Sequence, residues 1–191
     1  AKLTVHGLNV HPGSAKGIMK NAILMANQFI TMLPPAETPA HTAGYEGFYH
    51  VCDFSGDETT ATVTLIVRDH DRAKFEARKA FLVRLCDYLN GEWGEGRFVL
   101  DMKDSYYNMR EIIEENMSLI TNAETAMRAA GVEPLTMPIR GGTDGARLSY
   151  MGIPCPNLST GGANFHGVHE YIPVKSMYKM VEVLLNLVAK P

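Results

Sequence analysis

The chain has 191 residues, of which 46% are hydrophobic and 20% charged, a composition typical of a globular protein that can build a real core. Its formal net charge of −3 leaves no broad basic surface, so the sequence predicts no binding to nucleic acid and no binding to a membrane. Three widely spaced cysteines, Cys52, Cys86 and Cys155, make a poor disulfide framework and favour a reducing cytoplasm.

The first part of the chain begins with a strand and a helix. Leu3 and Val5 alternate with polar residues, which predicts a strand. After a break at residues 11–13, Ser14 is a candidate cap for a helix. Apolar residues then follow helical spacing over residues 18–33, and two prolines end the helix.

A hairpin, a second helix and a last strand follow. Residues 45–54 are rich in aromatic side chains and residues 59–67 alternate Thr with Val, which together predict a hairpin. Asp71 can cap the second helix, and residues 97–102 are a short strand. The order βαββαβ over residues 1–104 predicts a ferredoxin-like module of four antiparallel strands with both helices on one face.

The remainder has a different pattern. A helix is predicted over residues 114–130, a strand over 135–139, a loop over 140–145 that leads into a short helix, a second strand over 154–158, and an amphipathic helix at the end. The fold class is therefore α/β of the α+β kind: a ferredoxin-like module followed by an incomplete α/β layer. We place a hinge at residues 105–114 and a second domain at residues 115–191.

Two histidines and a glutamate lie within five positions near the end of the chain, at His166, His169 and Glu170. The spacing differs from the His-Glu-x-x-His helix of metalloproteases, and the nearby glycines indicate a loop. Zinc takes three or more such ligands, and no other segment supplies them convincingly. The spacing alone leaves a metal ligand and a pair of solvated histidines about equally open.

Three basic residues are candidates for contacting a substrate. Arg140 precedes the glycine-rich loop and can clamp a carboxylate, although a tight strand-to-helix turn is the plainer interpretation. His11 lies after a strand and can donate to a developing oxyanion, although a lone loop histidine is more often plain surface. Arg68 ends a strand and can clamp an anion, with a local ion pair as the default explanation.

Taken together, the motifs are more specific than any one of them. In their order along the chain they resemble the M20 family of dinuclear zinc peptidases, and within it the tripeptide aminopeptidases. The stretches that carry the resemblance run through nearly the whole chain: Asn9 to Gly13, Gly44 to His50, Asp104 to Glu111, Pro138 to Gly145, Pro154 to Leu158, and His166 to Glu170.

The resemblance implies a catalytic α/β domain that holds two zinc ions and a ferredoxin-like lid inserted into it. Residues 1–104 resemble the lid, and the residues from 115 onward resemble the C-terminal part of the catalytic domain. His166 matches a zinc ligand, His11 matches a lid histidine near the substrate, and Arg140 matches a substrate-contacting loop. The family's general base and its other metal ligands match nothing here, so no residue of this chain is assigned as catalytic.

The resemblance implies the release of the N-terminal residue from a tripeptide by a metal-activated water. We expect the chain to be part of such an enzyme, inactive by itself, with weak or no zinc binding. Its expected partners are a short peptide, the missing N-terminal segment and a second copy of the chain. The alternative is a non-catalytic lid that pairs chains, and a phosphate site at Gly141 and Gly142 is disfavoured because the loop lacks a lysine.

Overall fold

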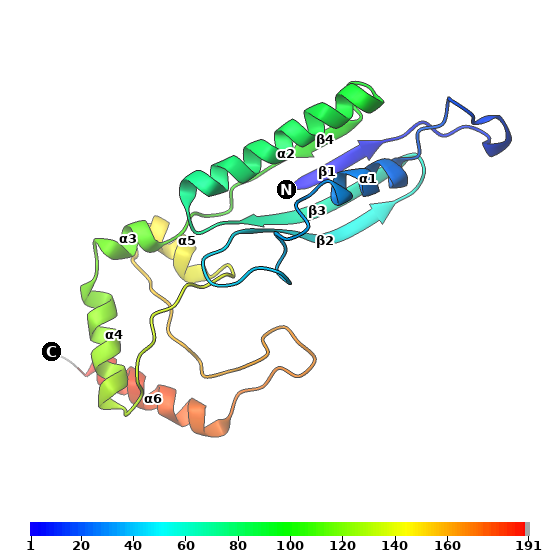
Figure 1. The fold of residues 1–191 in the computed structure, drawn as a ribbon. Coiled ribbons are helices and arrows are strands. Elements are labelled where there is room, and N and C mark those ends of the chain that lie inside the picture. Colours follow the sequence, from blue (N-terminus) through cyan, green and yellow to red (C-terminus); the bar gives the residue numbers. More distant parts are fainter. Residues whose placement is uncertain (190–191) are drawn as a thin grey trace. The chain divides into compact units, whose positions relative to one another are not determined.

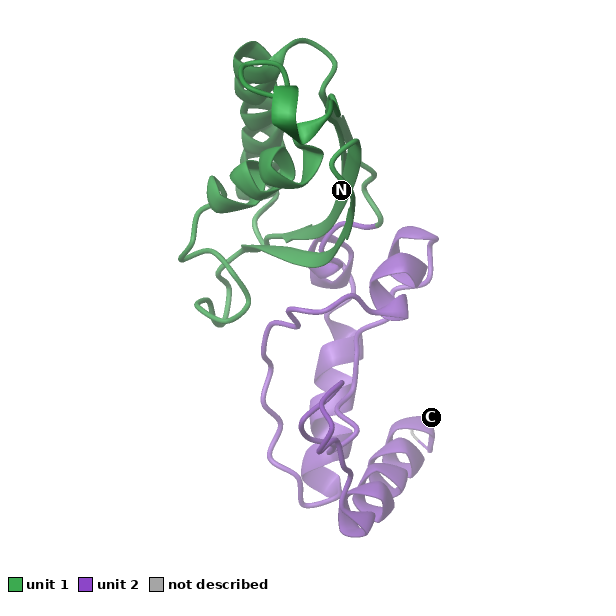
Figure 2. Ribbon diagram, turned by 90° about the vertical axis from the view of Figure 1, so that its right-hand side faces the viewer, with its two compact units in different colours: residues 1–105 green, residues 106–191 purple. Residues whose placement is uncertain are grey.

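The computed structural model describes residues 1–189 and divides the chain into two compact units (Figure 2). Unit 1 is Ala1–Ser105, and unit 2 begins at Tyr106. Over the described residues, no helix combines the length and the apolar character that crossing a bilayer requires.

Unit 1 is built on a sheet of four strands in the order β2-β3-β1-β4. Every pair of neighbouring strands is antiparallel, which confirms the predicted sheet and its ferredoxin-like topology (Figure 1). The predicted hairpin forms, with a β-bulge between Val51 and Asp53 that shifts the register of its first strand. The strands are β1 (Lys2–His6), β2 (Phe48–Gly56), β3 (Thr60–Arg68) and β4 (Phe98–Asp101).

Helices α1 (Ala22–Thr31) and α2 (Arg72–Trp93) lie on the same face of the sheet, as predicted (Figure 2). Alternate strand residues point to opposite faces, so one face of each strand can be apolar throughout. Leu3 and Val5 of β1 are fully buried, and they share one core with Phe29 of α1 and Leu82 of α2. Because both helices bury side chains in the same core, the opposite face of the sheet has no helix among the elements of unit 1.

The starts of the two helices follow the capping rules, with one correction. Asp71 caps α2 by accepting from the backbone N–H of Lys74, as predicted. The predicted cap of α1 at Ser14 is wrong: Ser14 belongs to a short 3₁₀ turn, η1 (Pro12–Ser14). The side chain of Asn21 caps α1 instead, because its Oδ1 accepts from the N–H groups of Ile23 and Leu24.

Unit 2 contains helices only, among its described residues. The helix predicted over residues 114–130 forms, but it begins at Ser118: residues 115–117 are a turn, and Glu114 ends the preceding helix. The predicted end at Gly131 is confirmed, since this glycine has a φ of 71°. The small core of unit 2 joins α4 (Ser118–Ala129) to α6 (Val174–Val188) through Ala126, Ala130 and Val183. The helices are α3 (Arg110–Glu114), α4 (Ser118–Ala129), α5 (Asp144–Tyr150) and α6 (Val174–Val188).

The two strands predicted in unit 2 are absent: residues 135–139 and 154–158 are irregular backbone within the described chain. A strand requires a neighbouring strand to satisfy its backbone N–H and C=O groups, and neither segment pairs with one. The side chains of Leu135 and Met137 are 79% and 65% exposed. The α+β class of the chain is confirmed, but the described residues of unit 2 form helices without a sheet.

Candidate functional site

The four side chains that the sequence singled out are divided between the units. His11 and Arg68 belong to unit 1, whereas Arg140 and His166 belong to unit 2. The residues at 105–114, predicted as a hinge, include α3, and their role as a hinge stays a prediction.

His11 lies on a segment that leaves the sheet after β1 and returns at α1 (Figure 1). The sequence forms a turn there because Pro12 occupies the first position of η1, where a missing N–H costs nothing. The His11 side chain caps that turn: its Nδ1 accepts from the backbone N–H of Gly13 over 3.1 Å. The imidazole is exposed to solvent.

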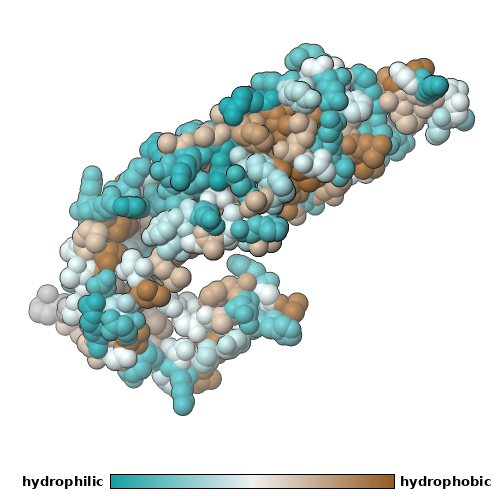
Figure 3. Space-filling view, viewed as in Figure 1, coloured by the Kyte–Doolittle hydropathy of each residue, from teal (hydrophilic) through white to brown (hydrophobic). Residues whose placement is uncertain are grey.

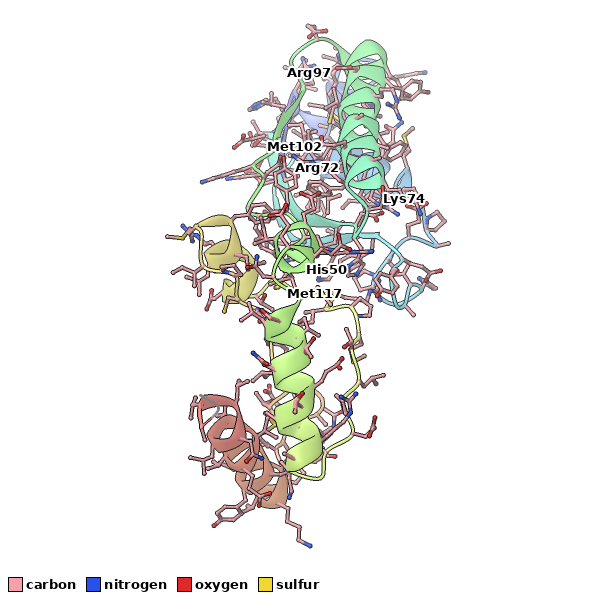
Figure 4. The ribbon with its side chains drawn as sticks, turned by 90° about the vertical axis from the view of Figure 1, so that its left-hand side faces the viewer. His50, Arg72, Lys74, Arg97, Met102 and Met117 are labelled. Carbon is pink, nitrogen blue, oxygen red and sulfur yellow. The ribbon has the colours of Figure 1, made fainter. Side chains whose placement is uncertain are left out.

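Arg68 lies at the other end of the same sheet. It is the last residue of β3 and pairs with Phe48, whereas His6, at the end of β1, pairs with Thr60. The nine residues of β3, Thr60–Arg68, span about 26 Å along the strand. Figure 4 shows this separation, with Arg97 beside the end of β1 and His50 toward the opposite end of the sheet.

A tripeptide extends over only about 10 Å. One copy of unit 1 therefore does not bring His11 and Arg68 to the same short peptide. Sequence reasoning placed both residues at strand ends but did not use the antiparallel course of β1 and β3, which sends those ends in opposite directions.

Arg140 is half-buried and comes directly before the glycine-rich loop. The predicted short helix forms as α5, capped by Thr143, whose hydroxyl accepts from the N–H of Ala146 over 3.4 Å. A side chain at Gly145 would lie 2.5 Å from the carbonyl oxygen of Cys155. Gly145 is therefore required for close packing of residues 154–157 on α5, a structural role that the loop's composition did not reveal.

The His166 side chain is carried by a loop that closes on itself. Ala163 and Tyr171 form a two-residue bridge at its base, with N···O distances of 2.9 and 3.2 Å. His166 has a φ of 65°, a left-handed conformation that is uncommon outside glycine. The Glu170 carboxylate accepts from the backbone N–H of His166 over 2.9 Å, and both side chains are exposed.

These residues do not by themselves make a zinc site. An exposed imidazole on a closed loop is suited to be one ligand of a zinc ion. However, no three His, Cys, Asp or Glu side chains gather at one point in the part of the chain that the structure describes. The donors present therefore fit a contribution of one ligand to a larger site, and no catalytic step is assigned to a metal here.

Arg78 forms a buried polar cluster that sequence reasoning missed. Its Nε donates to the Asp69 carboxylate over 2.8 Å, and its guanidinium also binds Glu37 and lies 5.1 Å from the centre of the Tyr49 ring. Burial raises the pKa of the Tyr49 hydroxyl above its ordinary value. The cluster ties the loop after α1 to β2 and α2, and no short sequence motif indicates it.

Comparison with known proteins accounts for both parts of the chain. Residues 1–96 match the family model of the M20 peptidase dimerisation domain. The chain is 55% identical to peptidase T of Halothermothrix orenii over 188 residues, and 51% identical to peptidase T of Caldanaerobacter subterraneus subsp. tengcongensis over 188 residues. Each match covers 98% of this chain and 46% of the relative.

Two crystal structures share the fold. A tripeptidase from Staphylococcus aureus superposes with a TM-score of 0.78 at 19% identity, covering 98% of this chain and 49% of the tripeptidase. An aminopeptidase PepT from Bacillus cereus superposes with a TM-score of 0.70 at 20% identity, covering 98% of this chain and 50% of that chain. The chain thus spans about half the length of the curated relatives that it matches, 46% for the two named above. With its first 96 residues forming the peptidase dimerisation domain, the chain belongs to the M20 peptidase family.

Proposed function

We propose that this chain is the lid and the C-terminal part of the catalytic domain of a tripeptide aminopeptidase that releases the N-terminal residue of its substrate. The observation that carries the proposal is the 55% identity to a peptidase T across 98% of the chain, which includes both units. In the complete enzyme, two zinc ions would supply a Lewis acid and a water of lowered pKa.

His166 is the residue of this chain that we assign to the metal. Its support is an exposed imidazole on a loop that is closed by the Ala163–Tyr171 bridge and by Glu170. We assign the other ligands and the general base to the part of the relatives that this chain does not span. The chain alone is therefore inactive and binds zinc weakly or not at all, because one imidazole cannot hold the ion tightly.

Three basic residues contact the substrate in this proposal. His11 and Arg68 act from unit 1, and because one copy of that unit does not bring both to one short peptide, the two act from different copies of the chain. Arg140 acts from the loop before α5. A guanidinium pairs with the carboxylate of a short peptide through two parallel hydrogen bonds. Because His11 and Arg68 lie at opposite ends of the sheet, the effect of substituting one on catalysis should not depend on whether the other is substituted.

The partners follow from the surfaces of the two units. Unit 2 exposes apolar side chains on α6, where Val188 is 75% exposed and Leu185 is 60% exposed. Figure 3 colours the hydrophobic residues at the surface brown. Such a surface is normally covered by a partner. We propose that the remaining part of the longer enzyme covers it, and that unit 1 pairs two copies of the chain. The three free cysteines support a cytoplasmic location.

The test is a tripeptide hydrolysis assay with added zinc, applied to this chain and to the full-length enzyme. The chain alone should show no turnover, and the full-length enzyme should cleave. His166→Ala in the full-length enzyme should abolish activity, whereas the matched change His169→Ala should cost less. Turnover by the chain alone would refute its inactivity, and greater damage from His169→Ala would refute the ligand assignment.

The second candidate function is a non-catalytic module that pairs chains. The match of residues 1–96 to a dimerisation domain favours it. The two candidates differ in the gene: an upstream segment with His-x-Asp and Glu-Glu patterns supports the peptidase, and its absence supports the module. Light scattering tests the pairing that both share, and a clean monomer at high concentration would count against it.

A further inference from the structure

The segment of residues 163–171, hereafter the histidine loop, comes shortly before α6 in unit 2 (Figure 1). Its two ends are joined by the bridge between Ala163 and Tyr171, whose backbone groups bond to each other over 2.9 and 3.2 Å. The backbone just before the bridge lies close to α6, because a Cβ at Gly161 would be only 2.6 Å from Cβ of Ser176. The loop is therefore closed at its base and held beside the helix that follows it.

The interior of the histidine loop is a series of short-range hydrogen bonds. Asn164 donates through Nδ2 to the carbonyl of His169 over 3.2 Å, and its own carbonyl accepts from the N–H of Gly167 over 2.9 Å. Glu170 donates its N–H to the carbonyl of Gly167 over 3.1 Å. Because each of these bonds joins residues at most five positions apart, the loop specifies its own shape.

His166 has a backbone conformation in this loop that needs support. Its φ of 65° lies in the left-handed region, which residues other than glycine seldom adopt and keep only where surrounding contacts fix it. Asn164 has a similar φ of 58°, but its own side chain bonds within the loop. For His166 the contact comes from Glu170, whose Oε2 accepts from the His166 N–H over 2.9 Å. A hydrogen bond to an ionised acceptor is stronger than one between neutral groups.

This bond controls the imidazole of His166 through the backbone. The direction in which a side chain leaves the chain follows from the φ and ψ of its residue, so a change to an extended or right-handed backbone would turn the ring away. The bond is made with the backbone N–H, so it takes up neither ring nitrogen. Groups that hold a metal ligand without touching the metal typically change metal affinity by about 10- to 100-fold when they are removed.

We propose that Glu170 is a positioning residue for His166: by accepting from the His166 N–H, it holds the left-handed backbone and sets the direction of the imidazole that we assign to zinc. The carboxylate acts as a hydrogen-bond acceptor, and neither as a metal ligand nor as a base. The zinc role of His166 rests on the proposed function. The structure of the histidine loop rests on the contacts of unit 2 alone.

The loop contact is tested by hydrogen exchange, followed by NMR in this chain and in its variants Glu170→Leu and Glu170→Gln. The His166 amide should exchange faster in Glu170→Leu, because leucine is close to glutamate in size but has no acceptor. It should stay slow in Glu170→Gln, because the amide oxygen of glutamine can accept in the same place. Glu133→Leu, the same change at an exposed position after α4, is the control and should leave the rate unchanged. Equal rates in wild type and Glu170→Leu would overturn the proposal.

The zinc affinity of the full-length enzyme gives the second readout. Glu170→Leu should lower this affinity by about 10- to 100-fold, and Glu170→Gln should recover most of it. With cobalt(II) in place of zinc, the visible absorption reports the coordination geometry of the metal. The cobalt spectrum should change in Glu170→Leu, whereas Glu133→Leu should keep the wild-type spectrum.

The outcomes of the metal experiment separate the positioning role from the proposed function. Unchanged zinc affinity in Glu170→Leu would overturn the positioning role. A loss in Glu170→Gln as large as that in Glu170→Leu would also overturn it, because the carboxylate would then act through its charge. Absence of zinc binding by the wild-type full-length enzyme would instead overturn the proposed function and leave the exchange result standing.

Discussion

Arg78 donates through Nε to the Asp69 carboxylate over 2.8 Å, and the side chains of the two residues are only 15% and 1% exposed. The guanidinium also binds Glu37 from the loop after α1. This pair joins α2 to the residue that follows β3.

Removal of one member of this pair should destabilise unit 1. Arg78→Ala leaves the Asp69 carboxylate buried without its cation, which costs about 3 kcal/mol in the free energy of unfolding. The matched control is Arg128→Ala, since Arg128 and Glu124 form an exposed pair at 3.5 Å. That change should cost about 0.5 kcal/mol or less. Urea denaturation followed by circular dichroism measures both, and equal losses would contradict the expectation.

Burial should protect Cys86 from reaction. Its side chain is in the core of unit 1, and burial raises the pKa of the thiol to about 11. Since the thiolate is the nucleophile, iodoacetamide at pH 8 should modify the exposed Cys52 first and Cys86 only on unfolding. Mass spectrometry of the peptides over time measures the order. Early labelling of Cys86 in the folded chain would show that iodoacetamide reaches the core of unit 1 without unfolding.

The same pKa shift predicts a loss of stability in alkaline solution. The thiol of an unfolded cysteine has a pKa of about 8.5. Between that value and about 11, the folded state binds more protons than the unfolded state does. The free energy of unfolding should therefore fall as the pH rises through this window. Cys86→Ala should flatten this part of the pH profile, whereas Cys52→Ala should leave it unchanged.

The turn between β2 and β3 should respond to acid. Hydrogen bonds from the N–H groups of Thr60 and Thr59 to Asp57 lower the pKa of its carboxyl. The stabilisation is present above the pKa of the unfolded carboxyl and is lost as the pH falls through the lower folded value. Asp57→Asn should reduce the acid sensitivity of unfolding, and Asp101→Asn, at an exposed position on β4, serves as the control. Identical acid profiles of the two variants would contradict the role of the turn.

Gly145→Ala should destabilise unit 2 even though alanine is the better helix former. The added methyl carbon would lie 2.5 Å from the Cys155 carbonyl oxygen and 2.9 Å from Oδ1 of Asn157, which costs about 1–3 kcal/mol. Gly141→Ala is the control, because a Cβ there meets no atom within 4 Å. Thermal unfolding of both variants measures the difference. A gain in stability for Gly145→Ala would show that residues 154–157 shift at little cost.

The sequence predicts the elements of unit 1 because the signals are local. The alternation around Leu3 and Val5, the cap at Asp71 and the breaks at proline and glycine each act within a few residues. The one error in the caps, Ser14 in place of Asn21, arises because both residue types can accept an N–H bond. Only the geometry of the turn between them decides which one begins the helix.

The family was predictable from the sequence, but the arrangement of the candidate residues was not. Motif order along the chain was sufficient to recognise the family, whereas the roles of His11, Arg68, Arg140 and His166 stay predictions. The two strands expected in unit 2 did not form, because a strand depends on backbone partners that its own sequence does not specify. The Arg78 cluster was missed for a related reason, since its members come from segments far apart in the chain.

By itself, then, the sequence determined which segments of unit 1 are helices and strands, because periodicity and capping depend on neighbours in the chain. Only the tertiary structure decided that His11 and Arg68 occupy opposite ends of one sheet, because strand direction follows from pairing across the chain. It also decided that the His11 side chain accepts from Gly13, and that His166 has a left-handed backbone and donates its N–H to Glu170. Hydrogen bonds of this kind are formed by distance and angle, and residue type alone specifies neither.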